Sequence, residues 1–161
     1  EATMSERVGL LSQKLADEGR MIHDRLSRLS PEQWSLPVQG DGGTWTAHDL
    51  LAHLVAAERG HQQIIQLVAC GGPGAPADLD IDRYNARTVS ELAGRSGADL
   101  LKDFAAVRRD TVEFVGTLSD EDLQRRGRHP VLGGDALLSD MVRLITLHGR
   151  MHLKDLRQAG L

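Results

Sequence analysis

Two histidines four residues apart are the side chains whose spacing most directly suggests chemistry. His148 and His152 lie in "LHGRMHLKDL", residues 147–156, where the apolar positions follow a helical period. Residues four apart share one helix face, so two imidazoles there can bind one metal ion at about 2.0–2.1 Å. Zinc proteases that use this spacing need glutamate directly after the first histidine, and Gly149 stands there instead. The pair therefore indicates a metal site only if the chain supplies a third ligand, and Gly149 argues against that protease class.

A third ligand has to come from another helix. His53 is the best candidate, because it lies on the flank of an apolar stripe earlier in the chain, and His61, two turns further on, is the runner-up. His48 faces roughly away, whereas His23 and His129 have no convergent partner in the sequence. We expect the three side chains to converge near one end of a helical bundle. A histidine cluster in the core or at an interface is the alternative interpretation.

Four further features have competing interpretations. Asp49 lies one turn before His53 and could orient its ring, although a role in helix capping already accounts for it. Glu58 could face a cavity as a base, but a solvated helix face is the favoured interpretation. Gly149 costs about 1 kcal/mol relative to alanine inside a helix, which suggests a close helix approach or space beside the site. The arginine clusters at 108–109 and 125–128 are read as solvated, with one arginine available for a substrate carboxylate.

Composition narrows the class of protein. The 161 residues have a net charge of −4, with 40% apolar and 26% charged residues, which fits one globular domain over 1–161. Two Trp, one Tyr and two Phe are too few for the stacking surfaces of nucleic-acid binders, and we expect no nucleic-acid partner. No apolar run approaches the roughly 20 residues of a membrane span, so no membrane partner is expected. The single cysteine and the lack of a signal peptide favour the cytoplasm. Residues 1–3 are interpreted as a cloning remnant before a natural start at Met4.

The elements that must position the histidines are helices. The apolar period predicts four of them, and no strand: residues 4–29, a second from Thr46 to the glycines at 71 and 72, a third region from 80 to 118 with a break at 94–97, and a fourth over 135–158. "RLSPEQW" (28–34) and "TLSDEDL" (117–123) each predict a short helix that opens a long connection. The prediction is an all-α four-helix bundle with long connections between helices 1 and 2 and between helices 3 and 4.

Longer stretches resemble a known family. "WTAHDLLAHL", "DRYN" and "HPVLGGDALLSDMVRLITLHGRMHLKDL" are similar to the DinB/YfiT-like superfamily of metalloenzymes, in the branch related to mycothiol-dependent maleylpyruvate isomerases. The resemblance implies a four-helix bundle of unusual connectivity, with His53, His148 and His152 as metal ligands. The isomerase branch itself tends to carry glutamate where His148 stands. The resemblance therefore implies metal binding more directly than isomerase activity.

The predicted function follows from an open metal site. Three protein ligands and a free coordination position are typical of a catalytic centre, with zinc or nickel the most suitable metals. The resemblance implies that a low-molecular-weight thiol such as mycothiol acts in transfer or isomerisation of a small electrophile, with Arg83 and Asn85 of "DRYN" as substrate contacts. Hydrolysis by bound water, or metal or ligand binding without catalysis, are the alternatives. No residue is assigned a catalytic role, and a homodimer is compatible with the sequence.

Overall fold

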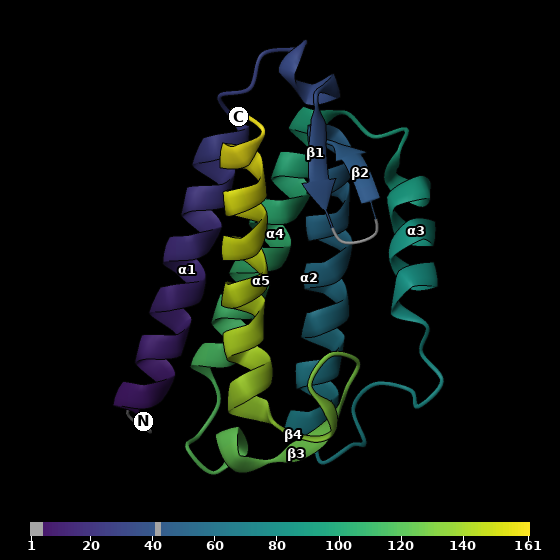
Figure 1. Ribbon diagram of the computed structural model, residues 1–161. Helices are drawn as coiled ribbons and strands as arrows, with labels where there is room; N and C mark the ends of the chain where they lie inside the picture. The colour runs from purple at the N-terminus through teal and green to yellow at the C-terminus, as the bar shows by residue number, and fades with distance from the viewer. Residues whose placement is uncertain (1–4, 41–42) are drawn as a thin grey trace.

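The computed structural model describes residues 5–40 and 43–161, so the proposed start at Met4 and the remnant at 1–3 lie outside the described residues. The helices are α1 (Glu6–Leu26), α2 (Ala47–Ala69), α3 (Ile81–Leu92), α4 (Gly97–Gly116) and α5 (Leu138–Gln158). Helix α1 packs on α4 and α5, and α2 packs on α4 and α5, while α3 lies against the outside of α2 (Figure 1). The predicted helical bundle with two long connections is confirmed.

Side-chain caps fix where most of these helices begin. Ser5, Asp80 and Ser96 each accept a backbone N–H from the first turn of α1, α3 and α4, which satisfies a donor that the helix cannot pair itself. At α2, Thr46 and Asp49 form the reciprocal capping box that the sequence predicted. The third predicted region is broken as expected, since α3 ends at Leu92 and α4 begins at Gly97.

Each long connection contains a β-hairpin that the sequence analysis did not predict. A 3₁₀ turn (Gln33–Ser35) leads into β1 (Pro37–Gly40) and β2 (Gly43–Thr46), and a second 3₁₀ turn (Asp122–Gln124) leads into β3 (Arg126–His129) and β4 (Gly133–Leu137). The strands have four or five residues, too few for a clear alternation of apolar side chains. Because β4 takes residues up to Leu137, the last helix begins at Leu138 rather than at Asp135. Helix α1 likewise ends at Leu26, three residues before the predicted end.

The two connections make the chain repeat one pattern. Helix, 3₁₀ turn, hairpin and helix follow one another from α1 to α2 and again from α4 to α5, with α3 between the two halves. The hairpins lie at opposite ends of the bundle (Figure 1). Among the described residues, no helix is long and apolar enough to cross a membrane.

The core consists of two apolar clusters separated by a polar layer. One cluster contains Val8 to Leu15 of α1 and Met141 to Ile145 of α5, and the other contains Ile22 and Leu26 of α1 with Leu153 and Leu156 of α5. Along each bundle helix a buried polar side chain lies between the two clusters: Glu18 on α1, Glu58 on α2, Arg108 on α4 and His152 on α5. His53 is also buried, among the α2 residues of the second cluster. The candidate site therefore lies midway along the bundle, and not near one end as predicted.

Candidate metal centre

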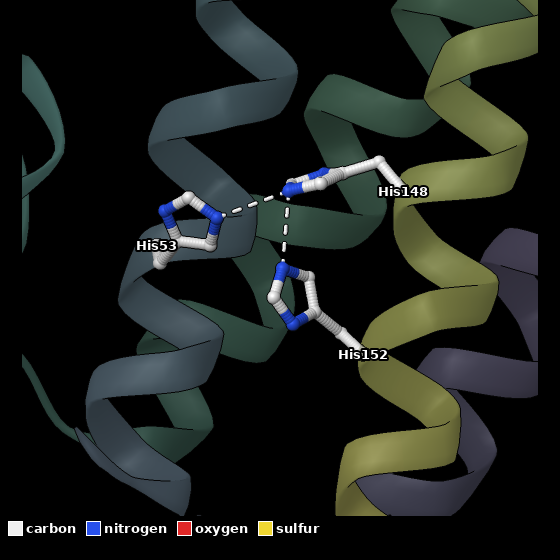
Figure 2. Close-up of side chains that lie close together, drawn as sticks. All are labelled: His53, His148 and His152. Carbon is white, nitrogen blue, oxygen red and sulfur yellow. Dashed lines mark hydrogen bonds between the residues drawn. The ribbon is translucent and has the colours of Figure 1, made fainter. Parts of the chain in front are cut away.

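Three histidine rings meet between α2 and α5. The Nε2 atom of His148 lies 3.1 Å from Nε2 of His53 and 3.0 Å from Nε2 of His152 (Figure 2). Candidate ligand atoms of the three residues all lie within 4.8 Å of one another. His53 and His152 are buried, and the ring of Trp45 packs on His53 with its centroid 4.7 Å away. The structure thus brings together the three histidines that the sequence singled out, which we call the histidine trio.

Hydrogen bonding orients one ring of the trio for ligation. His152 Nδ1 lies 3.0 Å from a carboxylate oxygen of Asp155, one turn further along α5. A carboxylate accepts, so Nδ1 carries the proton of the neutral ring and Nε2 presents its lone pair to the other two rings. Carboxylates commonly hold metal-binding imidazoles in this way. Asp49, considered for this role toward His53, instead completes the cap of α2.

The donor set of the trio fits a divalent metal ion. Bonds of about 2.0–2.1 Å at tetrahedral angles would place ligand nitrogens roughly 3.3 Å apart, close to the two separations found here. Lone pairs that face one point repel each other unless a proton or a cation lies between them, and a proton can join only two of the three nitrogens. A metal ion satisfies all three. Among the described residues, this is the one group with a metal-binding arrangement.

A buried ion network lies beside the trio. Arg108 donates from Nε and one terminal nitrogen to the two oxygens of Glu58, each at 2.8 Å, and from its other terminal nitrogen to Glu18 and to the carbonyl of Leu15 at 3.0 Å. All three charged side chains are buried. The favoured interpretation of Glu58 as a solvated residue is therefore wrong, and both of its oxygens are engaged by Arg108. Nor is Arg108 part of a solvated charge cluster, although its neighbour Arg109 is exposed.

Electrostatics differ among the three members of the network. Burial raises the pKa of Glu18 above its usual 4.5, and the charge of Arg108 offsets only part of that effect. Burial also acts to lower the pKa of Arg108, but the charges of Glu58 and Glu18 outweigh it and raise that pKa, so the guanidinium stays protonated. One guanidinium thus pairs with two carboxylates, and it compensates the burial of Glu18 only in part. Its Oε1 atom has no hydrogen-bond partner among the described residues.

His53 and His148 of the trio line a cavity of about 890 Å³, whereas His152 is buried and is not among the lining residues. This volume is in the range of cavities that take small organic ligands. Asn85 of α3 lines the cavity, whereas Arg83 is exposed and is not among the lining residues; Arg87, one turn further along α3, takes a place at the wall. The lining is mostly apolar, with side chains that include Ile64, Leu67, Leu79, Val131, Leu144, Leu147 and Met151.

Two more histidines line the same cavity. His129, at the end of β3, is buried and stacks on His61 of α2 with ring centroids 5.4 Å apart and planes at 7°. His129 therefore does have a partner, contrary to the sequence analysis. Burial first, and then neighbouring charged groups led by His148, lower the pKa of His61 to about 3, and burial lowers the pKa of His129 to about 4. Both rings are neutral at neutral pH.

The sequence analysis missed three features of the site region, and the sequence spacing could have revealed only one of them. Asp155 follows His152 by three residues, a spacing that puts it on the same helix face. Arg108 looks like any other surface arginine beside Arg109, because its partners are 50 and 90 residues away in the sequence. The contact of His129 with His61 depends on an unpredicted hairpin.

Comparison with known proteins identifies the family. Residues 14–156 match the DinB superfamily, which is most of the chain. The chain belongs to the DinB superfamily. This confirms the family that the sequence motifs suggested, while the sequence has no significant match among curated proteins.

Solved structures share the DinB fold at low sequence identity. YfiT from Bacillus subtilis, a probable metal-dependent hydrolase with an unusual four-helix bundle topology, is 16% identical with a TM-score of 0.78, over 99% of this chain and 89% of that one. The mycothiol-dependent maleylpyruvate isomerase is 13% identical with a TM-score of 0.73 over 96% of this chain, which spans 60% of the enzyme. The colibactin self-resistance protein ClbS, in complex with double-stranded DNA, is 13% identical with a TM-score of 0.72, over 98% of both chains. At these identities the likeness shows the fold alone.

Proposed function

We propose that this DinB-superfamily protein binds a divalent metal ion, zinc or nickel, through His53, His148 and His152, and acts on a small electrophile held in the adjoining cavity. The observation that supports this most directly is the convergence of three Nε2 atoms next to a cavity of about 890 Å³, which His53 and His148 line. When bound, the metal would supply Lewis acidity and lower the pKa of a bound thiol or water. Side chains of this protein would orient the metal ligands and the substrate.

Those side chains orient the ligands and limit access of water. Asp155 fixes the proton of His152 on Nδ1, and Trp45 packs on the ring of His53. The apolar lining of the cavity disfavours bulk water around the bound substrate, which strengthens polar interactions there. Asn85 and Arg87 on α3 supply polar groups at the wall that could contact a substrate oxygen. Arg83, predicted as a second substrate contact, is exposed and outside the lining, which favours Arg87 for that role.

The nucleophile that we propose is the thiolate of a low-molecular-weight thiol of the mycothiol type, in transfer or isomerisation. Cys70, the single cysteine of the sequence, is exposed at the end of α2 and does not line the cavity. A thiol used at this site would therefore come from a cosubstrate. The likeness to a mycothiol-dependent isomerase supports this choice, and such a thiol implies a cytoplasmic protein.

The test compares wild type with His152→Ala and His148→Glu, using mycothiol and a panel of small electrophiles, with metal content measured beside each rate. We expect thiol-dependent turnover that His152→Ala abolishes, and metal retention in His148→Glu, because a carboxylate oxygen ligates at a similar distance. His23→Ala, on the surface of α1, is the matched control. Equal rates in wild type and His152→Ala would contradict a catalytic metal.

A second candidate is hydrolysis by metal-bound water, which the likeness to YfiT supports. Product formation with and without thiol separates the two reactions. Binding of ligand without turnover, at full metal occupancy, would favour a non-catalytic role. We propose a small molecule as the partner of this protein. Because ClbS was solved with DNA, a gel-shift assay with duplex DNA should accompany these assays. We expect no shift of the DNA band.

A further inference from the structure

The paired rings of His61 and His129 are joined by a hydrogen bond whose direction the structure determines. His129 Nε2 lies 3.3 Å from His61 Nδ1. On its other side, His129 Nδ1 lies 3.1 Å from the backbone nitrogen of Val131 and 3.4 Å from that of Leu132. A backbone N–H can only donate, so His129 Nδ1 is an acceptor and carries no proton.

This fixes the protonation pattern of both neutral rings. The one proton of a neutral His129 must be on Nε2, and it is donated to Nδ1 of His61. Nδ1 of His61 is then an acceptor too, which leaves the proton of the neutral His61 ring on Nε2. The turn between β3 and β4 thus determines the tautomer of a ring on α2.

The same pattern argues against a second metal site at this pair. A metal bound at His129 Nε2 would require the proton to move to Nδ1, where two backbone N–H groups already point. Within the trio, His152 has the opposite proton position, because it donates from Nδ1 to Asp155 and presents a lone pair from Nε2.

We propose that His61 binds an oxygen atom of the substrate, by donating its Nε2–H to a carbonyl or carboxylate group beside the histidine trio. The inference rests on the proposed function in taking the cavity as the substrate site. His61 lines that cavity, and its ring centroid lies 5.7 Å from that of His148, so the His61 ring is adjacent to the trio. His129 acts through His61, as the residue that holds its tautomer.

The cavity lining specifies the rest of the ligand. Most of the wall is aliphatic, from α2, α3, α5 and the β3–β4 turn. Such a wall favours an apolar body, and the Nε2–H of His61 favours an oxygen acceptor placed near the trio. The substrate class is thus a small apolar molecule with a carbonyl or carboxylate oxygen.

The first test reads the tautomers directly in the wild-type protein. Protein labelled with ¹⁵N at histidine is studied by long-range ¹H–¹⁵N correlation, metal-free and loaded with zinc, because protonated and bare ring nitrogens resonate in separate ranges. We expect His61 and His129 both to carry their proton on Nε2 in both samples. A His61 ring protonated on Nδ1 would overturn the proposal.

The second test measures the N–H as a binding group. Acetophenone and ethylbenzene have similar shapes, but only the first has an oxygen acceptor, and their affinities are compared by NMR titration of the metal-free protein. A hydrogen bond of about 0.5–1.5 kcal/mol corresponds to a preference of roughly 2- to 12-fold for acetophenone. We expect His61→Phe to abolish this preference, His129→Phe to reduce it, and His61→Gln, which keeps a donor, to retain part of it.

The controls separate this inference from the proposed function. His23→Phe, on the outer surface of α1, should behave as wild type. Because the titration uses metal-free protein, it can fail while the metal site stands, and loss of metal binding leaves it unaffected. An unchanged preference in His61→Phe would overturn the role of His61, and absence of binding by both compounds would overturn the ligand class.

Discussion

Oε1 of Glu18 on α1 occupies the volume that a side chain at position 149 of α5 would need. A Cβ added to Gly149 would overlap this oxygen and would lie 2.9 Å from Cδ1 of Ile22. Position 149 directly follows the ligand candidate His148. The glycine that breaks the zinc-protease motif is thus explained by a helix contact, in which α1 and its buried carboxylate lie directly against the segment of α5 that carries the ligands.

Replacing this glycine should therefore weaken the fold. By helix propensity alone, Gly149→Ala would stabilise α5 by up to about 1 kcal/mol, but displacement of Glu18 and Ile22 should outweigh that gain. We expect the free energy of unfolding to fall by about 1–3 kcal/mol, as for other overpacked cores. Urea unfolding followed by circular dichroism measures it. Gly116→Ala on α4 is the control, since its Cβ would meet only Ser12 Oγ at 3.9 Å; equal stability of the two variants would contradict the steric explanation.

The two carboxylates around Arg108 should differ in their contribution to stability. Glu58 uses both oxygens, so Glu58→Gln breaks a buried pair and should lower the free energy of unfolding by about 3–5 kcal/mol. Glu18→Gln should cost much less, because Oε1 of Glu18 has no partner among the described residues and burial already disfavours its charge. Urea unfolding of both variants at pH 7 checks the order, which similar losses would contradict.

The raised pKa of Glu18 also predicts a pH dependence. A carboxyl whose pKa is higher in the folded state stabilises the fold most at pH values below its usual 4.5, and this contribution is lost as the pH rises through the folded-state value. Glu18→Gln cannot ionise and should lack this loss. Relative to wild type, the variant should therefore become more stable as pH increases from 4 to 8. Parallel dependence of the two proteins on pH would show that Glu18 has an ordinary pKa.

Asp155 should matter for metal affinity more than for folding. Asp155→Asn removes the charged acceptor that holds the Nδ1 proton of His152. We expect the zinc affinity to fall by about 10- to 100-fold, as is typical when a metal-binding histidine loses such a partner. Competition with a chromophoric chelator gives the zinc affinity. Asp140→Asn on the same helix, which pairs with Arg143 at the surface, should leave the affinity unchanged.

Metal retention should depend on pH in the direction expected for imidazole ligands. Only the neutral ring ligates, and the ordinary imidazole pKa is about 6.5, so bound metal should decrease as pH falls from 8 to 5. Dialysis at stepped pH, followed by elemental analysis, measures the retained metal. A constant metal content across this range would argue against ligation by the trio.

Sequence periodicity predicted the helices and the trio because both depend on local spacing. The capping box of Thr46 and Asp49 predicted the start of α2. The four-residue spacing of His148 and His152 predicted that both rings lie on one face of α5. His53 could be chosen over His61 because it lies closer to the inner stripe of α2. Such features need no knowledge of distant partners.

The features that were not predicted depend on contacts between distant segments. Arg108 differs from Arg109 only in the helix face that it occupies, and its burial is possible because Glu18 and Glu58 converge from two other helices. The hairpins are short, and the base of the first is joined to the start of α2 by the hydrogen bond from Ala47 N–H to the carbonyl of Leu36, the residue before β1. The pairing of His129 with His61 depends on the second hairpin, whose strand β3 contacts α2.

The repeated helix–turn–hairpin–helix pattern has a consequence for how the molecule matures. His53 belongs to the first half and His148 to the second, 95 residues later. On the ribosome, α5 emerges after the other four described helices, so the nascent chain offers a single histidine of the trio until α5 has been synthesised. Loop closure of this length must precede tight ligation. Binding of the ion would thus be a late event in folding. A metal that binds only when the two halves are packed together would stabilise the folded state against their separation.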